Sequence, residues 1–159
     1  MIDADTLRSL LDYDPDIGVF TWRVTRGGYV KEGHEAGCVN GRGYISIQIQ
    51  GKKYAAHRLA WLYIYGVMPQ DQIDHINRTR SDNRIVNLRE ATATQNIANT
   101  RKYRGYLPKG VRKNHGKFQA RIQIDNCLVN LGFYETPEQA HAAYCEAAQK
   151  EFGAYHRAG

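Results

Sequence analysis

The strongest constraint on the fold is a pair of alternating segments near the C-terminus. Residues 117–124 (KFQARIQI) and 127–134 (CLVNLGFY) alternate apolar and polar side chains with the period of two that is typical of a β-strand. Asp125 and Asn126 lie between them, and both residue types favour the tight turn of a β-hairpin. The segment therefore predicts two antiparallel strands joined by a two-residue turn.

A helix should follow this hairpin. Residues 136–139 (TPEQ) have the pattern of a capping box, with proline at the first helical position. One apolar stripe of mostly small side chains then recurs with helical spacing, comprising Ala140, Ala143, Tyr144, Ala147 and Ala148. Such a stripe can lie close against a sheet. With one further strand before residue 117, we expect a three-stranded antiparallel sheet packed on one helix.

The N-terminal part should mix short helices and hairpins. A short helix is expected over residues 3–11, a strand over Val19–Arg23 and a hairpin over residues 43–57. Residues 58–66 (RLAWLYIYG) carry apolar side chains around most of their circumference, which predicts a core helix ended by Gly66.

An acidic segment with Asp12, Asp14 and Asp16 invites comparison with a calcium-binding loop. Such a loop needs glycine at its sixth position and glutamate at its twelfth. Here these positions hold Ile17 and Arg23. The segment therefore favours a turn that leads into the following strand.

Composition limits the class of protein. With 159 residues, 42% of them hydrophobic, the chain can form one ordinary domain or two small ones. The three cysteines lie far apart, which favours a reducing compartment, and we expect them to be small buried side chains. The sequence has neither a signal peptide nor an apolar run of 18 residues. We therefore expect no membrane partner and a cytoplasmic location.

The charge distribution points to an anionic partner. The net charge is +6, and no acidic residue occurs between Asn99 and Arg121. Tyr103, Tyr106 and Phe118 are interleaved with the basic residues of this stretch, which is more typical of nucleic-acid binding than of a solvated surface. The basic residues are Arg101, Lys102, Arg104, Lys109, Arg112, Lys113, Lys117 and Arg121.

Residues 73–96 (IDHINRTRSDNRIVNLREATATQN) carry the residue types of a hydrolytic site. If residues 73–75 and 87–90 are antiparallel strands, the helix after Thr92 can return over this hairpin. Carboxylate and amide oxygens are hard ligands suited to Mg²⁺, and a neutral histidine beside them can take a proton from water. Asp74 and His75 are adjacent, so their side chains converge only at an irregular strand end. On these residues alone, a solvated loop remains an alternative.

The same segment, with AHRLAWLYIYG before it, resembles the HNH nucleases of the phage and homing-endonuclease group over about residues 43–100. The resemblance implies a ββα-metal site with His75 as general base, Asp74 and Asn96 as metal ligands, and Asn87 as the residue that braces the loop and orients His75. Asn96 stands where other branches have histidine, which favours Mg²⁺ (or Mn²⁺). His57 and Arg58 match the family's H-R pair, for which we expect support or phosphate contact.

Residues 104–157 resemble the apetala / ethylene-response-factor DNA-binding domain. The resemblance rests on residues 110–112 (GVR), 116–120 (GKFQA), 131–136 (LGFYET) and 140–144 (AHAAY). In that family the sheet lies in the major groove of DNA. The resemblance implies DNA contacts from Arg112, Lys113, His115, Lys117, Arg121 and Gln123. His115 and Asn130 replace two tryptophans of the family, so its base preference does not carry over.

Together these features predict an α+β chain of three parts. Residues 1–100 would form the HNH nuclease domain, with an N-terminal hairpin and helix region and a ββα-metal core. Residues 101–108 would be a basic linker, and residues 109–159 the DNA-binding domain.

The expected function is metal-dependent hydrolysis of phosphodiester bonds in double-stranded DNA. A homing-type or phage enzyme is expected, acting in the host cytoplasm if phage-encoded, with no obligatory protein partner evident. Two alternatives are a catalytically inactive DNA-binding regulator that keeps the nuclease fold and a structural RNA-binding protein. The intact set of Asp74, His75, Asn87 and Asn96 argues against the regulator. The RNA-binding alternative leaves the Asp74-His75 pair unexplained.

Overall fold

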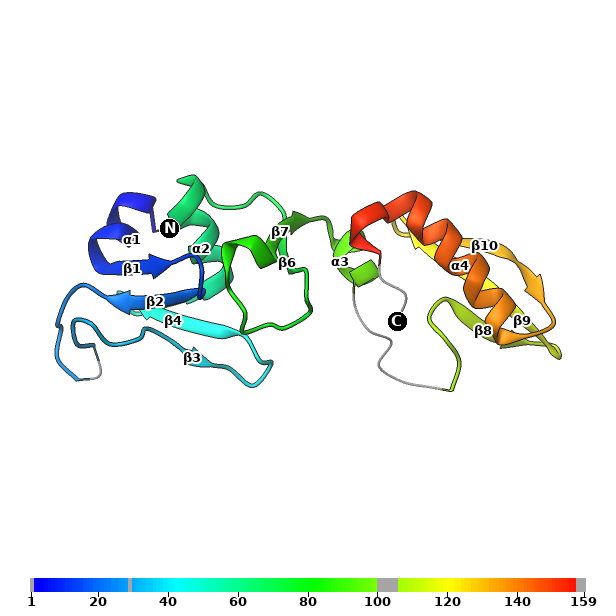
Figure 1. The fold of residues 1–159 in the computed structure, drawn as a ribbon, viewed down its shortest axis with the longest axis horizontal. Helices are drawn as coiled ribbons and strands as arrows, with labels where there is room; N and C mark the ends of the chain where they lie inside the picture. The colour runs from blue at the N-terminus through cyan, green and yellow to red at the C-terminus, as the bar shows by residue number, and fades with distance from the viewer. Residues whose placement is uncertain (1, 29, 100–105, 157–159) are drawn as a thin grey trace. The chain divides into compact units, whose positions relative to one another are not determined.

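The computed structural model describes residues 2–28, 30–99 and 106–156 (Figure 1). The chain divides into two compact units, Met1–Glu90 and Ala91–Gly159. Within the described residues it is an α+β protein with four α-helices and several small antiparallel sheets, in agreement with the predicted class. The predicted arrangement of domains stays a prediction.

The first unit begins with a helix and a hairpin. Helix α1 (Ala4–Leu10) starts where the Asp3 side chain accepts a hydrogen bond from the Thr6 amide. Strands β1 (Leu11–Asp14) and β2 (Val19–Trp22) pair antiparallel. The Asp14 carboxylate accepts hydrogen bonds from the two amides at residues 16 and 17, so it forms part of a tight turn, as predicted.

A second sheet precedes the main helix of this unit. Its strands are β3 (Cys38–Val39), β4 (Ile45–Ile49) and β5 (Lys52–Ala55), in the order β3-β4-β5. Helix α2 (Ala56–Tyr65) follows directly and ends at Gly66, which has a positive φ of 75°. The helix contributes Ala56, Leu59, Ala60 and Leu62 to the buried core, as the predicted core helix requires. Ile64 and Tyr65 near its end are exposed.

The predicted hairpin of residues 73–90 is present in outline. Strand β6 (Gln72–His75) and strand β7 (Leu88–Ala91) form a two-stranded sheet, and a 3₁₀ turn, η1 (Ile85–Asn87), precedes β7. Ile73 and Leu88 belong to the same buried cluster as residues of α1, α2, β1, β2 and β4. This core fixes both strands, and it therefore fixes the end of β6, where Asp74 and His75 lie.

The second unit contains the predicted sheet and helix. Its elements are α3 (Ala93–Asn99), β8 (Val111–Asn114), β9 (Lys117–Ile124), β10 (Cys127–Tyr134), α4 (Pro137–Phe152) and the 3₁₀ turn η2 (Gly153–Tyr155). The sheet order is β10-β9-β8, and both pairs are antiparallel. The Asp125 and Asn126 turn has positive φ at both residues, as a two-residue hairpin requires. The Thr136 capping box is present at the start of α4.

One face of this sheet is covered by α4 (Figure 1). Ala120 and Ile122 of β9 are buried in clusters with side chains of α4. Because side chains alternate along a strand, Gln119, Arg121 and Gln123 project from the opposite face. Helix α3 also contributes to the core of this unit, since Ala98 is buried in one cluster with Ile122 and Phe152.

Two remaining expectations concern cysteines and membranes. Cys38 and Cys127 are exposed and Cys145 is half-buried, so the expectation that all three are buried is wrong. None of the helices in the described part of the chain is both long and apolar enough to span a bilayer.

Candidate active site and nucleic-acid interface

Asp74 and His75 lie side by side at the end of β6, and both side chains are buried. The chain turns immediately after them, where the Arg78 amide donates a 2.8 Å hydrogen bond to the His75 carbonyl. Arg78 has a positive φ of 65°. The predicted irregular strand end is therefore present directly beyond the two residues.

The carboxylate of Asp74 is held by Arg89 of β7. Oδ2 accepts from Nε at 2.9 Å and lies 2.8 Å from Nη2. Both side chains are largely removed from solvent, with 5% of Asp74 and 15% of Arg89 exposed. A charged pair in such surroundings needs this close geometry to offset the loss of hydration. Arg89 therefore fixes one of the two oxygens of Asp74.

The imidazole of His75 is oriented by Asn83. Nε2 of His75 lies 3.3 Å from Oδ1 of Asn83, and an amide oxygen can only accept, so Nε2 carries the proton. In the neutral ring the basic lone pair is then on Nδ1. Burial lowers the pKa of His75, while the Asn83 hydrogen bond and the Asp74 charge raise it. The net shift is downward, which favours the neutral ring that a general base requires.

Asn83 was not predicted as a site residue, and it is the most deeply buried polar side chain here, with 0% exposed. Its carbonyl accepts a 2.7 Å hydrogen bond from the Tyr13 hydroxyl of β1. Gly18 of the β1–β2 turn approaches the same backbone so closely that a Cβ would lie 2.4 Å from the Arg84 nitrogen. The N-terminal hairpin therefore supports the loop that orients His75.

Asn87 holds that loop from the other side. Its Oδ1 accepts from the Asn77 amide at 2.9 Å, and its Nδ2 donates to the Asp82 carbonyl at 2.8 Å. Its own carbonyl accepts from the Ile76 amide at 2.9 Å. These contacts tie the loop together, and the functional role of Asn87 stays a prediction. The hydrogen bond to the His75 ring itself comes from Asn83, which the loop carries.

His57 and Tyr44 surround His75 on another side. The His57 and His75 ring centroids are 5.1 Å apart, and Tyr44 lies 5.3 Å from His57 and 5.9 Å from His75. Burial lowers the pKa of His57 to about 4, and the neighbouring His75 and Arg58 add to the effect. Nδ1 of His57 is buried with no hydrogen-bond partner in the described part of the chain.

Arg58 is directed toward the backbone after α2. Its guanidinium donates to the Pro69 carbonyl at 3.0 Å and to the Asp71 carbonyl at 3.1 Å. These bonds fix the segment that leads into β6. The structure thus shows a supporting role for Arg58, and phosphate contact stays a prediction.

Asn96 lies on α3, which belongs to the second unit. Thr92 caps this helix, because its hydroxyl accepts from the Gln95 amide at 3.3 Å and its amide donates to the Gln95 side chain at 2.9 Å. The helix therefore begins directly after Thr92, as predicted. The role of Asn96 as a metal ligand stays a prediction.

The predicted cation ligands fit a hard divalent ion in kind. Asp74 and Asn96 offer oxygen atoms, and Mg²⁺ is bound through few protein oxygens because it keeps several waters. The described residues contain no group of three or more His, Cys, Asp and Glu side chains that could hold a metal. One carboxylate and one amide would suit Mg²⁺, whereas a structural zinc site takes four nitrogen or sulfur ligands.

The predicted DNA-binding residues of the sheet have different surroundings. Arg112 pairs in register with Gln119, so both share the face opposite α4 with Arg121. Lys113 pairs with Phe118, which packs toward α4, and Lys117 is bound to Glu135 at 2.6 Å. No acidic residue occurs in β8, β9 or β10.

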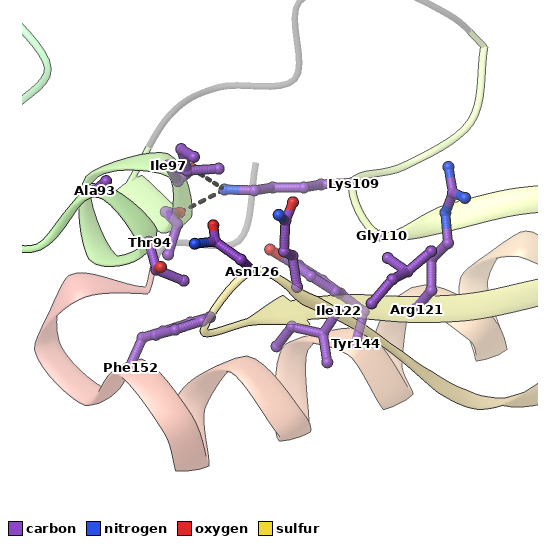
Figure 2. Close-up of a pocket in the computed structure, with 13 residues that line it drawn as sticks. Ala93, Thr94, Ile97, Lys109, Gly110, Arg121, Ile122, Asn126, Tyr144 and Phe152 are labelled. Atoms are coloured by element: carbon purple, nitrogen blue, oxygen red, sulfur yellow. Dashed lines mark hydrogen bonds between the residues drawn. The ribbon is translucent and has the colours of Figure 1, made fainter.

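The remaining predicted DNA contacts divide into three groups. His115 lies exposed in the β8–β9 turn with a positive φ of 45°, and Gln123 lies exposed on β9. Lys109 donates to the carbonyls of Ile97 and Ala98 at the end of α3 (Figure 2). Arg101, Lys102 and Arg104 lie outside the described residues.

A pocket of about 320 Å³ separates α3 from the sheet within the second unit (Figure 2). Lys109 spans it toward α3, and Arg121 points away from α4 at its edge. Its wall is completed by apolar side chains such as Ile122, Tyr144 and Phe152. The pocket therefore adjoins the basic face of the sheet.

Comparison with known proteins assigns the central segment. Residues 54–98 match the HNH endonuclease family. An uncharacterized HNH endonuclease of Acanthamoeba polyphaga mimivirus is 28% identical over 148 residues, which cover 91% of this chain and 70% of that protein. No significant match to a solved structure was found. The chain therefore contains an HNH endonuclease domain at residues 54–98, and both matches support a nuclease enzyme.

Proposed function

We propose that this chain is a metal-dependent DNA endonuclease of the homing or phage type, in which His75 is the general base. The observation that carries the proposal is the buried, oriented, neutral His75 directly beside the buried carboxylate of Asp74, within the segment that matches the HNH endonuclease family. With the proton on Nε2, the basic lone pair of the neutral ring is on Nδ1. Such an arrangement suits the activation of water.

In the proposed reaction a water molecule attacks the phosphorus atom of a phosphodiester. His75 Nδ1 takes the proton of that water as the new oxygen–phosphorus bond forms. The bond to the 3′-oxygen breaks, and this oxygen receives a proton from solvent. The hydrogen bond to Asn83 keeps the base in one tautomer and orientation throughout.

A divalent cation, Mg²⁺ or Mn²⁺, would be held by oxygens of Asp74 and Asn96, with Arg89 fixing Oδ2 of Asp74. Bound there, it would stabilise negative charge on the phosphate and on the departing oxygen. The second unit would bind duplex DNA through the sheet face that carries Arg112 and Arg121, with His115 and Gln123 beside it. Such a protein would act in the cytoplasm of the host cell.

The test is incubation of supercoiled plasmid with purified protein in Mg²⁺, Mn²⁺ or EDTA. We expect product with either ion and none in EDTA, which removes the metal. The product should be nicked plasmid, because one His75 site is present per chain. His75→Ala should lower the rate by about 100-fold or more while leaving DNA affinity nearly unchanged. A variant that cuts within tenfold of the wild type would show that His75 is not the base.

A second candidate is an inactive DNA-binding regulator, which the Asp74–Arg89 ion pair favours, because it occupies one oxygen of the proposed ligand. The plasmid experiment separates the two functions. Wild-type protein that binds duplex DNA tightly but leaves the plasmid intact in both ions would establish the regulator.

A further inference from the structure

Arg80 has surroundings unlike those of the ion-paired arginines in the same unit. It is exposed in the loop between β6 and β7, and its guanidinium lies 5.0 Å from the centroid of the Tyr44 ring. Its Nη1 also donates a 2.8 Å hydrogen bond to the Arg42 carbonyl. The side chain is thus held in one place by an aromatic ring and a backbone carbonyl.

Neither of these partners carries a negative charge. Arg23 is paired with Asp12, Arg84 with Asp82 and Arg89 with Asp74. Within the residues that the structure describes, no carboxylate lies within ion-pair distance of Arg80. The positive charge of Arg80 therefore stays available to an anion from outside the chain.

Tyr44 connects Arg80 to the candidate active site. The same ring that lies under the guanidinium is 5.9 Å from the His75 ring and 5.3 Å from the His57 ring. An anion bound by Arg80 would therefore lie next to the aromatic ring that also contacts the proposed general base.

We propose that Arg80 is a catalytic residue that binds a non-bridging oxygen of the phosphate under attack, with Tyr44 and the Arg42 carbonyl holding it in place. This assignment rests on the proposed nuclease function. The planar guanidinium matches the geometry of phosphate oxygens and can bind two of them at once. Because the side chain is already held, little conformational freedom is lost when the phosphate binds.

The test compares Arg80→Gln and Arg80→Lys with the wild type in the full chain. At saturating duplex DNA in Mg²⁺, Arg80→Gln should lower the cleavage rate by about 100-fold, the usual effect of removing one donor to a developing oxyanion. Arg80→Lys keeps the charge but loses the planar fork, so it should retain an intermediate rate. Arg23→Gln is the matched control, since Arg23 is also exposed but is paired with Asp12.

DNA affinity separates a contact to the reacting phosphate from a contact to a neighbouring one. In a His75→Ala background, Arg80→Gln should change the dissociation constant less than about threefold, because a contact that strengthens in the transition state changes the rate more than the affinity. Arg80→Gln could instead flatten the plot of log affinity against log salt by about 0.9 in this background and leave the cleavage rate unchanged in protein that keeps His75. Arg80 would then contact a neighbouring phosphate, and the assignment would be overturned.

The role of Tyr44 is tested by a double-mutant cycle. Tyr44→Leu should lower the rate in the wild type but have a smaller effect in Arg80→Gln protein, because the ring acts partly through the guanidinium. Equal effects in both backgrounds would remove Tyr44 from the proposal. If the wild type cleaves DNA and Arg80→Gln cleaves it at the same rate, only the Arg80 assignment is overturned. If the wild type leaves the plasmid intact, the proposed function itself is overturned.

Discussion

A buried amide decides which nitrogen of His75 carries the proton. Replacing Asn83 with alanine removes the acceptor from Nε2 and leaves a small cavity beside the ring. We expect the cleavage rate to fall by about 10- to 100-fold, at or below the lower end of the usual contribution of a general base, because His75 itself is still present. The free energy of unfolding should fall by about 1–3 kcal/mol. Single-turnover cleavage and thermal unfolding measure the two effects.

Asn83→Asp provides the matched control for this prediction, because a carboxylate is nearly the same size and still accepts from Nε2. It should recover more of the cleavage rate than Asn83→Ala. If both variants cut at the same reduced rate, the loss comes from packing and Asn83 does not orient the base.

His57 should make stability depend on pH. Its pKa is about 4 in the folded chain, against about 6.5 in an unfolded one. The unfolded state therefore binds more protons between these values, so stability falls as the pH drops from 6.5 to 4. His57→Phe keeps a ring beside Tyr44 and removes the titration. We expect its melting temperature to fall less than that of the wild type between pH 7.5 and pH 4.5.

The size of this effect is bounded by the shift in pKa. It corresponds to about 3 kcal/mol at most at pH 4, since each pKa unit is worth about 1.4 kcal/mol. Protonation of carboxylates elsewhere lowers the stability of both proteins over the same pH range, so the difference between the two proteins isolates His57. If the melting temperatures of the two proteins fall in parallel as the pH drops, folding does not lower the pKa of His57.

Sequence patterns identified some of these residues and missed others for a physical reason. Asp74 and His75 are adjacent and differ in type from their neighbours, so they stand out in the chain. Asn83 is one of several asparagines in the same polar segment. Burial distinguishes it, and that burial comes from Tyr13 and Gly18, more than sixty residues earlier in the sequence. No local pattern contains that information.

At the scale of elements, the β1–β2 turn supports the active-site loop. Gly18 has a φ of +74°, and a Cβ there would lie 2.4 Å from the Arg84 nitrogen. Gly18→Ala should therefore displace the backbone that carries Asn83, lowering both the melting temperature and the cleavage rate. Circular dichroism and plasmid nicking measure the two quantities.

Gly27 offers a control with the same backbone strain. Its φ is +76°, but a Cβ there would have no neighbour within 4 Å. Gly27→Ala should lower stability by about 1 kcal/mol through the positive φ alone and leave the cleavage rate unchanged. If the two variants cut equally well, the turn does not support the site.

Elements were predictable where a local signal determines them. The hairpin of residues 117–134 follows from alternation and its turn residues, and α4 follows from the Thr136 capping box. Strand β3 has only two residues, which is too short for any periodicity to mark it, although it pairs with the next strand along the chain, β4. The β1 strand was missed for a different reason, because it follows α1 without a turn residue that would separate the two.

At the scale of the whole molecule, α3 shows how a sequence boundary and a packing boundary can differ. The predicted nuclease domain ends at residue 100, whereas the compact units divide between Glu90 and Ala91. Ala98 packs with Ile122, Tyr144 and Phe152, and Lys109 binds the last carbonyls of α3. A single buried alanine carries no sequence signal for its partners. Changes in the second unit should therefore affect the helix that carries Asn96.

The proposed DNA-binding face can be tested through its charge. Arg112 and Arg121 share the sheet face opposite α4, where each would release counterions on contacting phosphate. Arg112→Ala and Arg121→Ala should each flatten the plot of log affinity against log salt by about 0.9 on random duplex DNA. If either arginine reads a base, its loss should also cost about 1–3 kcal/mol on a preferred site. Titrations at several salt concentrations in His75→Ala protein measure both quantities.

Lysine variants give the controls for this face. Lys150 is exposed near the end of α4, on the helix side of the unit, so Lys150→Ala should leave the slope unchanged. Lys117 is already neutralised by Glu135, and its loss should flatten the slope less than the loss of Arg121. The arginines form a DNA-binding face only if their loss flattens the slope more than the loss of Lys150 does. Equal slopes for all of these variants would mean that the basic strands are a solvated surface and that DNA binds elsewhere on the chain.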